Sequence, residues 1–112
     1  MKIDERLVGN VTILDVSGQI KLGLEGVTLK DKIHSIVNQG NKNIVVNLGQ
    51  VDYVDSSGLG DLVGAHTTVS RAGGTMKLLN LTKKMRDLLS ITKLLTVFES
   101  FDSEQDAVKS FT

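Results

Sequence analysis

Short apolar runs alternate with segments of helical periodicity along this chain, and this alternation limits the folds that it can adopt. Ile44 to Leu48 and Met76 to Leu81 are predicted to be buried strands. Between them, from Leu59 to Val69, apolar residues recur at the spacing of one helical face. Strands that are joined by helices form parallel pairs, with the helices packed on the sheet. We therefore predict an α/β fold.

The N-terminal segment predicts a β-hairpin. Ile3 to Val8 and Val11 to Ser17 are rich in apolar and β-branched residues, and the turn dipeptide Gly9-Asn10 separates them. We expect the second strand to end at Ser17-Gly18 and a loop to run from Gln19 to Gly26. Together with the later strands, the hairpin gives a mixed sheet that is mostly parallel after its first pair.

About four helices are expected. The predicted helices are Leu29 to Val37, Leu59 to Val69, Thr82 to Leu94 and Ser103 to about Phe111. In the third helix, Thr82 or Asn80 is the expected cap, and the residues expected to face inward are Met85, Leu88, Leu89 and Ile91. Residues Val97, Phe98 and Phe101 are expected to form a short strand or extended edge.

Length and composition favour one small domain, residues 1–112, and exclude several functions. Lys plus Arg and Asp plus Glu each number 13, so no excess of positive charge attracts nucleic acid. There is no cysteine, which excludes disulfides and thiolate metal sites. The charged N-terminus is not a signal peptide, and no apolar run approaches the roughly 20 residues of a membrane span. We expect a soluble, cytoplasmic protein with no membrane partner.

The junction from Val51 to Gly64 carries the candidate chemistry. Asp55, Ser56 and Ser57 are residue types that cap helix starts, because their side-chain oxygens accept from unpaired N–H groups. Glycines follow closely and leave the backbone bare beside the two hydroxyls. A negative charge placed here would sit at the positive end of a helix dipole. The junction is therefore a good target for a modifying enzyme.

An enzymatic role for this junction would require motif and partner residues that the sequence does not supply. Val54 stands where the nucleophile elbow of a hydrolase needs its first glycine. The two histidines, His34 and His66, fall on predicted helices, where core or surface positions are the commoner explanation. We expect no catalytic residue.

Cofactor and metal sites are also disfavoured. The glycines at 58, 60 and 64 only approximate a dinucleotide fingerprint, because the third lies one place late. Asp52, Asp55 and Asp61 suggest magnesium, but carboxylates around a turn are more often caps and dipole partners. We expect neither cofactor nor metal, and we expect Gly60 and Gly64 to let the helix approach the sheet closely.

The same stretch resembles a known signature. Val46-Asn47-Leu48 followed by Val51-Asp52-Tyr53-Val54-Asp55-Ser56-Ser57-Gly58-Leu59-Gly60 is similar to the motif of STAS domains, specifically of bacterial anti-sigma factor antagonists. The similarity continues over nearly the whole chain, through the opening hairpin, Gly73-Gly74, Leu78-Leu79-Asn80, Leu88-Leu89, Phe98 and Ser103 to Val108.

The resemblance implies a two-state switch rather than an enzyme. In such proteins the serine matching Ser56 is phosphorylated by an anti-sigma factor that is itself an ATP-dependent serine kinase. The unphosphorylated antagonist binds that kinase and frees the sigma factor, and a PP2C-type phosphatase restores it. The partner-binding residues implied are Lys21, Asp55, Ser56, Ser57, Gly58, Leu59 and Asp61.

Two positions depart from the family pattern, and alternatives stay open. Lys21 stands where an acidic residue is frequent, which changes the charge that the kinase or its nucleotide meets, and Lys93 stands where glycine is common. Ser57 is the second choice as phosphate acceptor, the other reading being a capping residue with a buried hydroxyl. The functional alternative is a STAS scaffold or a lipid-transport-system subunit without a phosphorylation switch.

Overall fold

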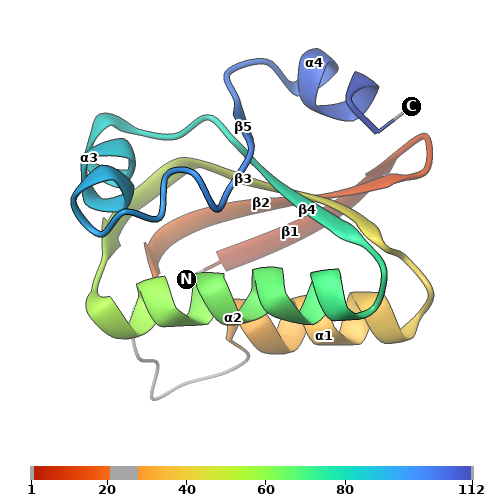
Figure 1. Ribbon diagram of the computed structural model, residues 1–112. Helices are drawn as coiled ribbons and strands as arrows, with labels where there is room; N and C mark the ends of the chain where they lie inside the picture. The colour runs from red at the N-terminus through yellow and green to blue at the C-terminus, as the bar shows by residue number, and fades with distance from the viewer. Residues whose placement is uncertain (1, 21–27, 112) are drawn as a thin grey trace.

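The computed structural model describes residues 2–20 and 28–111 (Figure 1). Its elements are β1 (Lys2–Val8), β2 (Val11–Ile20), α1 (Leu29–Asn38), β3 (Asn43–Val54), α2 (Ser56–Arg71), β4 (Thr75–Leu79), α3 (Lys83–Ile91), β5 (Ser100–Phe101) and α4 (Glu104–Lys109). One five-stranded sheet has the order β1-β2-β3-β4-β5. β1 and β2 are antiparallel, and every later pair is parallel. The predicted mixed sheet, N-terminal hairpin and α/β class are confirmed.

The sheet has unequal cover on its two faces. α1 and α2 lie side by side on one face, and α4 lies on the other (Figure 1). The larger core cluster joins the first face to α1, α2 and α3. A smaller cluster beneath α4 contains Val11, Ile13, Val45, Leu79 and Ala107. Among the described residues, no helix is both long and apolar enough to cross a membrane.

The strands beside the serine junction are longer than the sequence predicts. β2 continues through Gly18 to Ile20, so the expected end at Ser17-Gly18 is wrong. β3 continues to Val54, and Ile20 pairs with that residue. Two register shifts, between Asp15 and Ser17 and between Gly18 and Gln19, accommodate the extra residues of β3. Residues 21–26 of the expected loop, including Lys21, lie outside the described residues.

α3 is shorter than predicted, and one of its expected core residues is exposed. Thr82 is the cap, its side chain accepting from the backbone N–H of Met85 at 3.2 Å. Met85 and Leu89 are buried, but Ile91 is 79% exposed. Ile91 follows Leu89 by two residues, which turns it about 200° around the helix axis. The assignment of Ile91 to the core is therefore wrong.

Lys93 occupies a strained backbone conformation just after α3. Its φ is 62°, in the left-handed region where a Cβ costs roughly 1–2 kcal/mol. Lys93→Gly should therefore raise the free energy of unfolding by about 0.5–1 kcal/mol, the gain being reduced by the greater freedom of an unfolded glycine. Urea unfolding measures it. Lys93→Ala is the matched control, and equal effects of the two substitutions would contradict a backbone cause.

A charged network fastens the C-terminal helix to the hairpin across a span of 98 residues. The Arg6 guanidinium donates to Asp15 through Nε at 2.7 Å and to Glu104 through Nη1 at 3.0 Å. Asn47 Nδ2 also donates to Asp15, at 2.8 Å. Hydrogen bonds from Arg6 lower the pKa of both carboxyl groups and raise the pKa of Arg6. Three elements, β1, β2 and α4, are thus joined by one side chain.

This network predicts weakening in acid. The folded-state pKa values of Asp15 and Glu104 are lowered, so their contribution is present above the unfolded values of about 4 and is lost as the pH falls through the folded ones. Urea midpoints should therefore drop more steeply below about pH 5 for the native chain than for Arg6→Met. Parallel pH profiles of the two proteins would contradict this linkage.

Candidate functional site

The end of β3 and the first turn of α2 form the candidate site. Asp55 is the N-cap of α2, with extended backbone and its Oδ1 accepting from the backbone N–H of Gly58 at 2.6 Å. The backbone N–H of Leu59 donates to the carbonyl of Asp55 at 2.9 Å. Leu59 itself is buried in the larger core. The turn is therefore held at its start by the Asp55 cap and at its end by the burial of Leu59.

Gly58 lies against the end of the neighbouring strand. A Cβ placed on it would overlap the carbonyl oxygen of Ile20 and lie 2.6 Å from the carbonyl carbon. The same carbonyl accepts from the backbone N–H of Asp55 at 3.2 Å. Glycine is thus required here by close approach of two backbones, and this contact positions the start of α2 at the end of β2.

Both serines face solvent in the first turn of the helix. Ser56 is the first helical residue and Ser57 the second, and each side chain is exposed. Because Asp55 supplies the cap, the alternative in which Ser57 is a capping residue with a buried hydroxyl is wrong. The first-turn N–H groups and the helix dipole favour a negative charge at either position.

Asp61 has a defined structural partner on the adjacent helix. Its Oδ2 accepts from the backbone N–H of Lys30, in the first turn of α1, at 3.1 Å. Thr28 caps the same helix by accepting from the backbone N–H of Asp31 at 3.1 Å. The carboxylate on α2 therefore shares the capping of α1. A capping role was among the expectations for Asp61, but the sequence did not indicate that the capped helix is α1.

The other glycines of α2 do not bring it close to the sheet. Nothing lies within 4 Å of a Cβ placed on Gly60. A Cβ on Gly64 would meet the side chain of Lys30 on α1, at 3.2 Å from its Cδ. The expectation for Gly60 and Gly64 is therefore wrong, because the close approach to the sheet occurs at Gly58.

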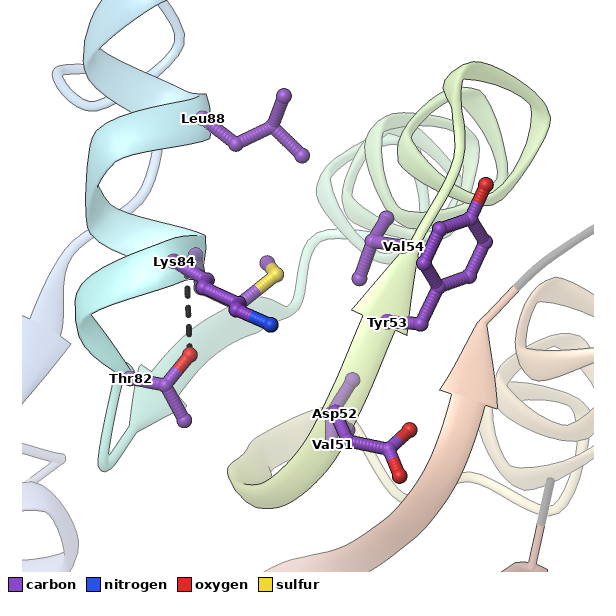
Figure 2. Close-up of a pocket in the computed structure, with 8 residues that line it drawn as sticks. Val51, Asp52, Tyr53, Val54, Thr82, Lys84 and Leu88 are labelled. Atoms are coloured by element: carbon purple, nitrogen blue, oxygen red, sulfur yellow. Dashed lines mark hydrogen bonds between the residues drawn. The ribbon is translucent and has the colours of Figure 1, made fainter.

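A pocket of about 200 Å³ opens between the end of β3 and α3 (Figure 2). It is lined by Val51, Asp52, Tyr53, Val54, Thr82, Lys84, Met85 and Leu88. Figure 2 shows Val54 of β3 and Leu88 of α3 on facing sides of the opening. Tyr53 is 49% exposed only three residues before Ser56. Sequence reasoning missed this pocket, although the β-forming residues Val51, Tyr53 and Val54 signal that β3 continues to it.

The remaining candidate residues do not converge. His34 is exposed on α1, whereas His66 of α2 packs edge-to-face on Phe98, with ring centroids 5.1 Å apart. The carboxylates of Asp55 and Asp61 are bound to backbone N–H groups in different helices. Within residues 2–20 and 28–111, no group of three or more His, Cys, Asp or Glu side chains could hold a metal ion. The junction therefore displays two exposed hydroxyl groups at a helix start, and the Asp55 and Asp61 carboxylates near them are bound to backbone N–H groups.

Comparison with known proteins defines the family. The family model for the STAS domain matches residues 2–107. The anti-sigma-B factor antagonist of Bacillus subtilis is 29% identical over 99 residues, which cover 88% of this chain and 89% of that protein. The chain belongs to the STAS domain family.

Solved structures share this fold. The crystal structure of an anti-sigma factor antagonist from Mycobacterium paratuberculosis has a TM-score of 0.79 at 19% identity, covering 97% of this chain and 92% of that one. The Bacillus cell fate determinant SpoIIAA, in its phosphorylated form, gives a TM-score of 0.72 at 19% identity, covering 99% and 100%.

Proposed function

We propose that this protein is an anti-sigma factor antagonist whose unphosphorylated form binds an anti-sigma factor serine kinase and thereby releases the sigma factor. Phosphorylation of Ser56 ends that binding, and a PP2C-type phosphatase reverses the modification. The observation that carries the proposal is an exposed Ser56 at the first position of a helix whose start is fixed by Asp55 and Gly58. The relatedness to an anti-sigma-B factor antagonist supports it.

A phosphate at Ser56 is compatible with the folded state. Phosphoserine carries about −1.5 to −2 charges at neutral pH, and a helix N-terminus favours negative charge by about 0.3–1 kcal/mol per charge at an exposed position. Ser56 is exposed, so the phosphate stays hydrated. Folding is therefore preserved when the group is added.

The same phosphate is incompatible with a close interface. Inside an interface it would lose its hydration, and an unpaired buried charge costs several kcal/mol. Each 1.4 kcal/mol is a factor of ten in affinity. The modification therefore acts on binding and leaves the fold intact, which is the behaviour required of a switch.

The contact surface is built around the exposed part of the junction. Ser56 and Ser57 offer their hydroxyls, and Gly58 is buried next to them against the carbonyl of Ile20. Asp55 and the buried Leu59 hold this turn in place from beneath. Lys21 belongs to the proposed surface by family resemblance alone, since it lies outside the described residues.

Peptide mass spectrometry tests the acceptor assignment. The kinase retained from the source cells by the native chain is incubated with the chain and ATP, and the modified peptides are fragmented. Phosphate is expected on Ser56 and should disappear from this turn in Ser56→Ala, while Ser57→Ala stays a substrate. Phosphate found only on Ser57 would overturn the assignment.

A further inference from the structure

We infer that Asp61 determines which of the two serines is modified, by placing a fixed negative charge beside Ser57 and away from Ser56. This inference rests on the proposed function, because it concerns the specificity of the same phosphorylation. Both hydroxyls are exposed in one helical turn, so exposure does not distinguish them. The surrounding charges do.

The Asp61 carboxylate is held in one place. It is partly buried between α2 and α1, and its Oδ2 is bound to the backbone N–H of Lys30 at 3.1 Å. A carboxylate that accepts from a backbone N–H at a helix start is held in one direction by that hydrogen bond. The Asp61 carboxylate is therefore directed to the face of α2 that meets α1.

Helical geometry places that anion near only one of the serines. Ser57 and Asp61 are four residues apart, which makes them neighbours on one face with Cβ atoms about 5–6 Å apart. Ser56 and Asp61 are five residues apart, which separates their directions by about 140° around the axis. A phosphate on Ser57 would therefore face the Asp61 carboxylate, and a phosphate on Ser56 would point away from it.

Among the described residues, no cation forms an ion pair with the Asp61 carboxylate. The Lys30 side chain extends along Gly64, about two turns beyond Ser57 on α2, with its Nζ 3.5 Å from a Cβ built on Gly64. At the N-terminus of α1, two backbone N–H groups already donate hydrogen bonds to Asp61 and to the Thr28 cap. The Asp55 carboxylate, bound to Gly58, precedes both serines. Among the described residues, repulsion from Asp61 is thus the charge difference that we infer between the two positions.

The first test needs no kinase. Phosphoserine is installed at position 56 or 57 during translation, in the full chain and in Asp61→Asn, and the melting temperature is measured at low ionic strength. Asparagine keeps an oxygen for the N–H of Lys30 and removes only the charge. The chain with phosphoserine at 57 should melt about 2–5 °C below the one with phosphoserine at 56. This gap should close in Asp61→Asn.

Salt provides the second measurement. About 1 M sodium chloride shortens the screening length to roughly 3 Å and should shrink the gap in the native background without any substitution. The salt measurement does not depend on whether Asp61→Asn folds, because it uses the native background. A gap that is absent at low salt, or that persists both in Asp61→Asn and at high salt, would overturn the role of Asp61.

A phosphorylation assay with the kinase gives an independent test of specificity. With the retained kinase and ATP, the ratio of phosphate on Ser57 to phosphate on Ser56 should rise at least about threefold in Asp61→Asn. An unchanged ratio would overturn the specificity role while leaving the proposed switch intact. Failure of the kinase to modify either serine would count against the proposed function alone, since the melting comparison is independent of it.

Discussion

Gly58→Ala should lower the free energy of unfolding by roughly 3 kcal/mol, although alanine is the better helix former. The added methyl group would occupy the place of the Ile20 carbonyl, and backbone atoms have little room to yield. To make space, α2 must move away from β2, which also stretches the hydrogen bond from Asp55 N–H to that carbonyl. Urea unfolding, monitored by circular dichroism, measures the loss.

Gly60→Ala is the matched control two residues further along the same helix. A Cβ at Gly60 meets no atom within 4 Å, so the substitution gains helix propensity without a clash. It should raise the free energy of unfolding by about 0.5–1 kcal/mol. Opposite signs at the two positions are the expected pattern, and equal signs would contradict the close approach at Gly58.

Phosphorylation of Ser56 should weaken binding to the kinase partner by about 100-fold or more while shifting the melting temperature by only a few degrees. The estimate follows from the 3–5 kcal/mol cost of an uncompensated charge in an interface. Ser56→Ala, which cannot accept phosphate, should bind persistently in the presence of ATP. Isothermal titration and thermal unfolding of the same samples separate the two effects, and a collapsed fold would contradict a switch that acts on binding.

Local sequence signals were enough to predict the framework of the site. Asp55, Ser56 and Ser57 follow an apolar strand and precede a helical stripe, and a capped helix start does occur there. The α/β class follows from the alternation of strand and helix patterns. These predictions succeed because capping and periodicity are encoded within a few neighbouring residues.

Contacts between distant segments were not predictable in this way. The sequence marks Gly58 as a turn residue, but its neighbour is Ile20, on another strand. The family resemblance implies that Asp61 binds a partner, but no local pattern predicts that its carboxylate accepts from the backbone N–H of Lys30. The pairing of Arg6 with Glu104 likewise leaves no local pattern. Such contacts depend on the register of β2 and β3 and on how the helices pack, which only the folded chain specifies.

Retention of partners from a lysate of the source cells is the most direct test of the central claim. The native chain and the chain carrying phosphoserine at 56 are immobilised at equal density, and bound proteins are identified by mass spectrometry. The proposed switch predicts an anti-sigma factor with a serine kinase domain that is retained by the unmodified chain and lost from the phosphorylated one. Retention of that kinase by both forms, or by neither, would contradict it.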